Sequence, residues 1–265
     1  MIRLMYSGVS GMRSHQVRMD IIGNNISNEN TTAYKSARAD FKDTLYQTIG
    51  ASGNVKGACQ VGTGVGIAGI TSNFDQGPLQ PTGRKLDLAI KGSGFFGALD
   101  TYGNLRFTRD GTFLFDKDGY LLTASGLNVV DPDGEEIRVE DLQTREKVEI
   151  SETGELFKTE FDLQTGETEY TTLGQIGLFN FKNVPGLTKT GDNLFLENDN
   201  TGERTSNADD PNGFGAIYSG YLEAANLDLI GELSNLIASQ RGYQANAKAF
   251  ITADEVLQEI IQLKR

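Results

Sequence analysis

"NLDLIGELSNLIASQRGYQANAKAFITADEVLQEIIQLKR", residues 226–265, carries apolar side chains at spacings that alternate between four and three residues. This heptad pattern keeps one stripe of an α-helix facing a partner helix. Asn226 is suited to cap the start of such a helix, and Lys264 and Arg265 suit the negative end of its dipole. The stripe consists of Leu229, Leu233, Leu236, Gln240, Tyr243, Ala247, Phe250, Asp254, Leu257 and Ile261.

The N-terminal segment "MIRLMYSGVSGMRSHQVRMDIIGNNIS", residues 1–27, shows the same alternation. Its stripe consists of Met1, Met5, Gly8, Met12, His15, Met19, Ile22 and Ile26. Isolated helices are marginally stable in water and depend on packing of their apolar face. We therefore expect the two terminal helices to pair as a coiled coil, and to become ordered when neighbouring copies supply the facing stripes.

Asparagines crowd the end of the first stripe, at Asn24, Asn25, Asn28 and Asn30. Asparagine competes with the backbone for hydrogen bonds, so it favours helix ends and turns. Two interpretations remain open for Asn24, Asn25 and Asn28. They fix the register between paired helices, or they only cap the helix before a turn.

The region between the ends has the signature of a β-rich domain, because 27 of the 32 glycines and all five prolines lie there. "LDLAIKG" alternates apolar and polar residues, as a half-buried strand does. Further apolar pairs are separated by Asp110-Gly111, Asp118-Gly119 and Ser125-Gly126, which are hairpin signals and predict an antiparallel meander. The expected fold is α+β. Its expected domains are a helical coiled coil (1–40 and 226–265), an extended linker with a Gly-rich β segment (41–80), and a β-rich outer domain (81–225).

Composition argues against most kinds of site. The net charge of −12 disfavours nucleic acid as a partner. Cys59 is the only cysteine and His15 the only histidine, so zinc and nucleophile–histidine sites lack their usual residues, and His15 reads as a packing residue. "GVGIAG" matches a dinucleotide fingerprint but precedes no helical pattern, which favours a Gly-rich strand. We expect no enzyme activity, cofactor, metal, membrane insertion or cleaved signal peptide.

Six segments together resemble the bacterial flagellar rod and hook protein family. They are "MYSGVSGMRSHQVRMDIIGNNISNENTTAYKS", "LDLAIKGSGFF", "FTRDGTFLFDKDGYLLTASG", "LGQIGLFNF", "GDNLF" and "SGYLEAANLDLIGELSNLIASQRGYQANAKAFITADEVLQ". Two residues depart from the family pattern: Ala33 stands where glycine is usual before Tyr34, and Gly242 stands where alanine is common before Tyr243. Gly242 is expected to destabilise the helix by about 1 kcal/mol relative to alanine.

The resemblance implies a structural axial subunit of the flagellum, a distal rod or hook protein that polymerises into a helical tube and transmits motor torque. It implies export through the flagellar type III apparatus without signal cleavage, and contacts with itself and other rod or hook proteins. "FKDTL", Phe41 to Leu45, resembles the family's export motif. The helical symmetry and junction partners stay open, as does the choice between rod and hook. The alternatives are a secreted oligomeric adhesin with coiled-coil ends and, more distantly, a glycosidase.

Overall fold

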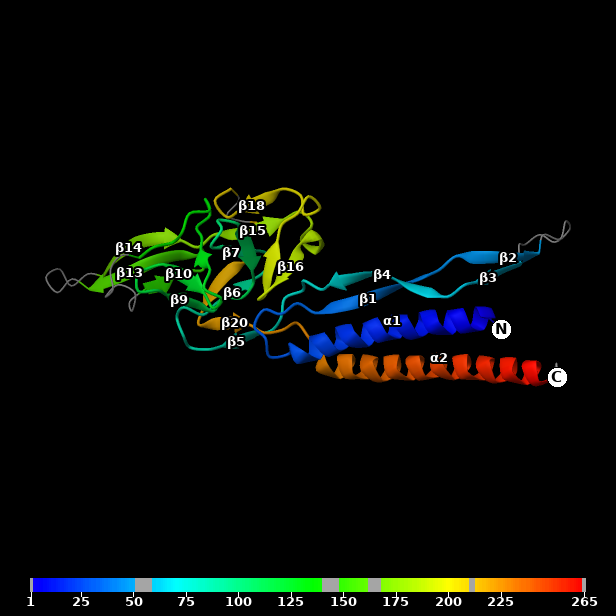
Figure 1. The fold of residues 1–265 in the computed structure, drawn as a ribbon. Coiled ribbons are helices and arrows are strands. Elements are labelled where there is room, and N and C mark those ends of the chain that lie inside the picture. Colours follow the sequence, from blue (N-terminus) through cyan, green and yellow to red (C-terminus); the bar gives the residue numbers. More distant parts are fainter. Residues whose placement is uncertain (1, 51–58, 140–147, 162–167, 210–212, 264–265) are drawn as a thin grey trace. The chain divides into compact units, whose positions relative to one another are not determined.

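The computed structural model describes residues 2–50, 59–139, 148–161, 168–209 and 213–263 (Figure 1). The chain divides into two compact units. Unit 1 comprises residues 1–29, 36–73 and 227–265, and unit 2 comprises residues 30–35 and 74–226. The chain therefore passes from one unit to the other four times.

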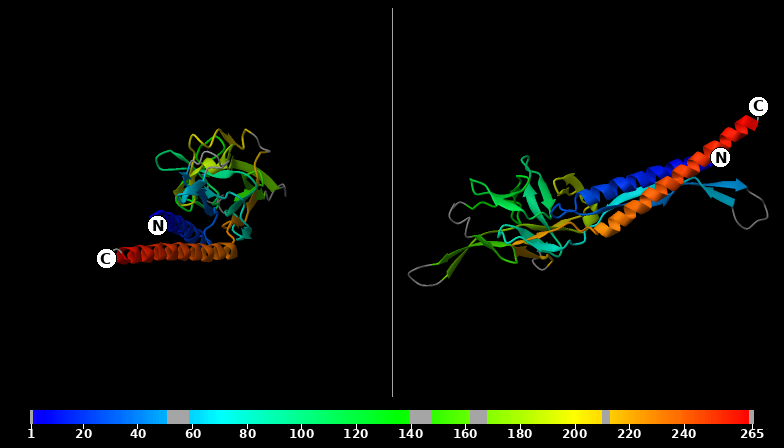
Figure 2. Two further views of the ribbon diagram at one scale, coloured as in Figure 1. Left: turned by 90° about the vertical axis from the view of Figure 1, so that its right-hand side faces the viewer. Right: turned by 90° about the horizontal axis from the view of Figure 1, so that it is seen from below.

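Unit 1 is built on two long helices, α1 (Ile2–Ser27) and α2 (Leu229–Leu263). They lie side by side and antiparallel, so both chain ends lie at the same end of the pair (Figure 2). With a rise of 1.5 Å per residue, α1 is about 39 Å long and α2 about 52 Å long. α2 consequently extends past the first residue of α1. The predicted α+β class with paired terminal helices is confirmed, although α2 begins at Leu229, which places the cap position at Asp228 rather than Asn226.

Two antiparallel ribbons complete unit 1. Strand β1 (Ala37–Asp43) pairs with β4 (Val65–Ser72), and β2 (Tyr46–Gly50) pairs with β3 (Cys59–Gly62). α1 packs against β1 and β4. A Cβ atom at Gly64 would lie 2.2 Å from the Ser10 hydroxyl of α1, so glycine permits this close approach. "GVGIAG" therefore belongs to a Gly-rich strand beside a helix.

Unit 2 is almost entirely antiparallel β structure with short strands. Its elements are β5 (Leu79–Pro81), β6 (Leu88–Lys91), β7 (Phe95–Leu99), β8 (Leu105–Thr108), β9 (Phe113–Phe115), β10 (Leu121–Thr123), β11 (Asn128–Val129), β12 (Val148–Ile150), β13 (Glu155–Phe161), β14 (Thr168–Gln175), β15 (Leu178–Phe181), the 3-10 turn η2 (Val184–Gly186), β16 (Thr188–Gly191), β17 (Leu194–Leu196), β18 (Arg204–Ser206), β19 (Ala216–Ser219) and β20 (Tyr221–Glu223).

The largest sheet runs in the order β16-β17-β8-β7-β11-β10-β9, and β15 joins β7 to β18. Side chains from its strands, and from the separate β6–β19 pair, fill two hydrophobic cores. The first core includes Leu88, Ile90, Phe96, Phe113, Leu121 and Ile217. The second consists of Phe95, Phe107, Val130, Phe179, Phe181, Leu187 and Phe195. Ile217, near the C-terminal end of unit 2, thus packs in the same core as Leu88 and Ile90 of β6.

The predicted meander is confirmed in part. Strands β9, β10 and β11 pair in sequence order. The hairpin predicted at Asp110-Gly111 is wrong, because β8 pairs with β7 and β17 instead of β9. A Cβ at Gly111 would lie 1.8 Å from the Leu88 carbonyl oxygen, and the Leu88 N–H donates to the Gly111 carbonyl at 3.0 Å. Glycine is therefore needed here for the close approach of two paired backbones and not for a turn.

Candidate assembly interface

The contact between α1 and α2 is made largely by small and polar residues. A Cβ at Gly11 would lie 2.8 Å from the Asn246 side chain, and one at Gly8 would lie 3.4 Å from the Asn246 carbonyl oxygen. One turn further along, Gly242 of α2 faces His15 of α1. These glycines let the two helix backbones approach closely, so the pair is held without a continuous seam of large apolar side chains.

The pairing of His15 with Gly242 explains one of the two departures from the family pattern. A Cβ at Gly242 would lie 2.6 Å from both Cε1 and Nε2 of the His15 ring. The ring also packs edge-on against Phe41 of β1, at 6.2 Å between ring centroids. Although His15 is only half-buried, its Nδ1 atom is buried without a hydrogen-bond partner in the described part of the chain. Burial lowers the pKa of His15, and the positive charge of Arg18 lowers it further.

Large apolar side chains of α2 lie on the surface. Ile230 is 78% exposed and Ile237 is 58% exposed, and Leu233 and Ile251 share this outer row. The helix therefore has two apolar sides: a partly buried one toward α1, and an outward one that nothing covers in the described chain.

The structure distributes the predicted stripe residues over both sides. Asn25 and Ile22 are buried in α1. The half-buried members are Met5, Met12, Met19, Ile26, Asn28, Leu229, Leu236, Phe250 and Leu257. The exposed members are Asn24, Leu233, Tyr243 and Ile261. Inward positions that the heptad count missed include Glu232, Ser239, Asn246 and Ala253.

The asparagines at the end of α1 have two kinds of partner. The Asn25 amide donates to the Ala37 carbonyl at 2.8 Å and accepts from the Ala37 N–H at 3.1 Å, as a neighbouring strand would. Asn25 also hydrogen-bonds Glu232 of α2, which opposes the rise that burial produces in the pKa of that carboxyl. Asn28 instead donates to the Asn24 carbonyl within the last turn of α1. Asn25 thus connects α1, β1 and α2, while Asn28 closes the helix end.

The predicted export residues lie in and just after β1. Phe41 is 38% exposed, and the Arg18 guanidinium stands 5.9 Å from its ring centroid. Leu45 follows the strand and is 84% exposed.

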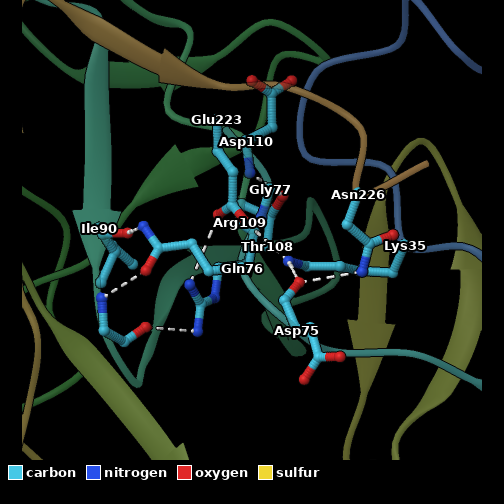
Figure 3. A network of polar contacts seen from close by, with 11 residues as sticks. Lys35, Asp75, Gln76, Gly77, Ile90, Thr108, Arg109, Asp110, Glu223 and Asn226 are labelled. Carbon is cyan, nitrogen blue, oxygen red and sulfur yellow. Dashed lines mark hydrogen bonds and ion pairs between the residues drawn. The ribbon is translucent and has the colours of Figure 1, made fainter. Parts of the chain in front are cut away.

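Unit 2 contains a buried network of charges (Figure 3). The Lys35 ammonium donates to Glu223 Oε1 at 2.6 Å and to the Asp75 carbonyl at 2.8 Å. Arg109 Nη1 lies 3.4 Å from Glu223 Oε2, and Arg109 Nη2 donates to the Gly92 carbonyl at 2.9 Å. Burial lowers the pKa of Lys35, and Glu223 opposes that change. The Glu223 carboxylate therefore pairs with two buried cations, Lys35 and Arg109.

The same network anchors the segment of residues 30–35. The Ala33 N–H donates to the Glu223 carbonyl at 2.7 Å, and the Asn226 N–H donates to the Tyr34 carbonyl at 3.3 Å. Ala33 is buried with φ of 56°, the left-handed conformation that glycine adopts most readily. The backbone therefore keeps a glycine conformation at the second departure from the family pattern. These contacts place residues 30–35 in unit 2, whereas the expected domain boundaries grouped them with the terminal helices.

Sequence reasoning missed this network because its members lie far apart in the chain. The sequence contains only an indirect indication that these charged residues are buried. Lys35 and Glu223 stand inside the two family segments "TTAYKS" and "SGYLEAAN", where neighbouring side chains are small or apolar. Charged residues are almost never fully buried unless they are paired.

Among the described residues, no three His, Cys, Asp or Glu side chains gather as metal ligands. Neither α1 nor α2, over the described residues, contains an apolar stretch long enough to traverse a lipid bilayer.

Three parts of the chain match known families. Residues 5–35 match "Flagella basal body rod protein", residues 89–158 match "Flagellar hook protein FlgE/F/G D1 domain", and residues 218–263 match "Flagellar basal body rod FlgEFG protein C-terminal". The flagellar basal-body rod protein FlgG of Bacillus subtilis (strain 168) is 39% identical, with 100% of both chains covered. The FlgG protein of Caulobacter vibrioides is 36% identical over 99% of this chain and 100% of its own. The flagellar hook protein FlgE of Borreliella burgdorferi is 26% identical, with 100% of both chains covered. The chain therefore belongs to the flagellar basal-body rod and hook protein family, and it is a structural axial subunit of the bacterial flagellum.

Proposed function

We propose that this chain is a rod subunit that polymerises with its own copies through unit 1. The outward row of α2, formed by Ile230, Leu233, Ile237 and Ile251, carries this proposal. Large apolar side chains that are exposed together on one face of a helix mark an interaction site. Because the α1–α2 contact already uses the inward side of each helix, the outward row is free for neighbouring copies.

This arrangement refines the expectation that the paired terminal helices become ordered only when neighbouring copies supply the facing stripes. The first partner of each helix is the other helix of the same chain. Neighbouring copies then cover the outward side. Contacts between two different surfaces of the same chain form an open helical assembly when the rotation between copies does not close a ring, as a helical tube requires.

The distribution of charge supports unit 1 as the assembling part. Unit 1 contains ten basic and nine acidic residues, whereas unit 2 contains fourteen basic and twenty-seven acidic residues. Like charges repel over roughly a Debye length of about 8 Å at physiological salt. Close packing of many copies is therefore easier for the nearly neutral unit 1 than for the acidic unit 2.

The relatives favour a rod subunit over a hook subunit. The FlgG relative from Bacillus subtilis aligns over 273 residues, close to the 265 residues of this chain. The FlgE relative from Borreliella burgdorferi requires an alignment of 442 residues. We therefore infer a place in the basal body, among other rod and hook proteins, and a mechanical role without catalysis.

We also propose that "FKDTL" is read by the flagellar export apparatus in the unfolded chain, without signal cleavage. In the folded chain Phe41 packs against His15 and Arg18 of α1, so its ring becomes fully available only on unfolding. Secretion of a Phe41→Ala, Leu45→Ala double variant tests this point. Normal secretion would remove the motif from the functional residues.

The polymerisation proposal is tested by Ile237→Glu, with Ala245→Glu as a matched control on an exposed position outside the outward row. Both variants should retain the helix content of the wild type by circular dichroism. Only Ile237→Glu should lose assembly in sedimentation and electron microscopy, because it places a charge at the centre of the apolar contact. Equal assembly of the two variants would contradict a role for the outward row.

A further inference from the structure

A groove runs along unit 1 between α1 and β4. It has a volume of about 350 Å³ and is lined mainly by apolar atoms. Val9 and Val17 of α1 form one wall, and Val65 and Ile67 of β4 form the other. This groove lies on a different side of α1 from the glycines that face α2. It is thus an apolar surface that the helix pairing leaves open.

The last two turns of α2 form a short overhang, residues 256–263. The contacts Gly11–Asn246 and His15–Gly242 set an antiparallel register in which Ile2, the first residue of α1, lies level with residue 255 of α2. The overhang therefore has no α1 residue beside it in the described chain. Val256, Ile260 and Leu263 are all exposed there, with Leu263 at 86%. Their spacing of four and three residues puts them on one face, the pattern of a helix that docks into a groove.

Charge complements the apolar match. Glu255 and Glu259 are exposed on α2 in the row next to Val256 and Ile260. The groove carries a basic residue, since Arg13 of α1 lines it.

The dimensions also agree. Val256 to Leu263 spans about 10 Å along a helix, and the groove follows α1 from Tyr6 to Val17, about 16 Å. The overhang of the same chain is not the occupant. Val9 lies level with residue 248 of α2 in the register above, so Ile260 is about 18 Å further along the helix axis.

We propose that the α2 overhang of a second copy docks in the α1–β4 groove, with Val256, Ile260 and Leu263 inserted and Glu255 and Glu259 facing Arg13. This inference rests on the proposed polymerisation and specifies one of its contacts. The groove and the overhang are different surfaces of the chain, so the contact is head-to-tail and repeats from copy to copy.

Disulfide trapping tests the contact in the full-length chain, with Cys59→Ser removing the native thiol. The pair Val9→Cys and Ile260→Cys should give covalent dimers and longer ladders under assembly conditions. The matched control keeps Val9→Cys and moves the second thiol to Ala238, an exposed position of α2 outside the outward row. We expect at least about tenfold more cross-linking with Ile260 than with Ala238, a factor equivalent to 1.4 kcal/mol. Equal yields, or more cross-linking with Ala238, would overturn the proposal and assign the groove to another segment.

A charge exchange gives an independent result. Arg13→Glu and Glu259→Arg should each slow assembly at least about tenfold, and the double variant should recover to within about threefold of the wild type. Both positions are exposed, so circular dichroism should show unchanged folding. Single variants that assemble normally while Ile237→Glu does not would overturn this contact and leave the proposed function standing. A wild-type chain that never assembles would overturn both.

Discussion

The Lys35 ammonium lies 2.6 Å from Glu223 Oε1, although 188 residues separate the two in the chain. Both side chains are almost fully buried. Glu223 also accepts from the Gly77 N–H at 2.8 Å, so the carboxylate holds the start, the middle and the end of unit 2 together. Folding of unit 2 is therefore complete only when all three segments are in place.

Replacing Glu223 by glutamine leaves two buried cations without their anion. Breaking a buried ion pair by removing one partner typically costs about 3–5 kcal/mol. We expect Glu223→Gln to lower the free energy of unfolding of unit 2 by an amount of this order, measured by urea unfolding followed through the near-ultraviolet signal of the tyrosines. The control is Glu149→Gln, which breaks the exposed pair with Lys85 and should cost less than about 1 kcal/mol. Equal effects would mean that the network contributes no more than a surface pair.

Ala33→Gly should stabilise unit 2. A non-glycine residue in the left-handed region carries a strain of about 1–2 kcal/mol, part of which the greater flexibility of unfolded glycine offsets. With φ of 56° at Ala33, we expect a net gain of about 0.5–1 kcal/mol in the same urea assay. Ala89→Gly, in strand β6 and with no positive φ, should instead destabilise the unit. Destabilisation by both substitutions would show that the left-handed turn is not strained.

Gly242→Ala tests the packing of His15. Alanine would normally stabilise a helix interior by about 1 kcal/mol over glycine. Here the added methyl group would meet the His15 ring, so the gain should be absent in the wild-type background. It should return in a His15→Ala background, giving a coupling of about 1 kcal/mol in a double-mutant cycle on the thermal unfolding of the helices. Additive effects would mean that the ring moves aside at no cost.

The helix pair should weaken in mild acid. Burial and Arg18 lower the pKa of His15 in the folded chain below its usual value of about 6.5. The unfolded chain therefore binds a proton more readily. The contribution of His15 is complete above about pH 6.5 and is lost as the pH falls below that value toward the lowered pKa. Thermal unfolding followed by circular dichroism between pH 7.5 and 5.5 should show the loss, and His15→Gln should remove the part of it that titrates in this window. An unchanged pH profile in His15→Gln would assign the effect to other groups.

Local sequence patterns predicted where the helices and strands lie better than they predicted which face of each helix contacts a partner. Period-two alternation located β6 and β9 to β11, and heptad spacing located both helices. Heptad counting misassigned faces on α2 because that helix is apolar on two sides. Leu233 and Tyr243 satisfy the count, yet they are exposed, and Gly242 takes the inward position. A one-dimensional pattern does not tell which of two apolar rows faces the partner within the same chain.

Contacts between residues far apart in the chain could not be predicted from the sequence, for a different reason. Nothing near Asn25 indicates that its amide bonds the Ala37 backbone, and nothing near Lys35 indicates Glu223. Each contact joins two separate segments of one unit: Asn25 and Ala37 belong to unit 1, and Lys35 and Glu223 belong to unit 2. The resemblance to the family did indicate which segments matter for one of them, because Lys35 and Glu223 both lie in segments that carried it.

In assembled filaments we expect the outward row of α2 to be buried between copies while the α1–α2 contact stays within one chain. Thiol labelling of Ile237→Cys in a Cys59→Ser background measures this directly, since Ile237 is 58% exposed in the single chain. We expect fast labelling of the free chain and at least about tenfold slower labelling in assembled filaments, with Ala245→Cys slowed much less. Equal labelling rates for Ile237→Cys in free chains and filaments would contradict this expectation.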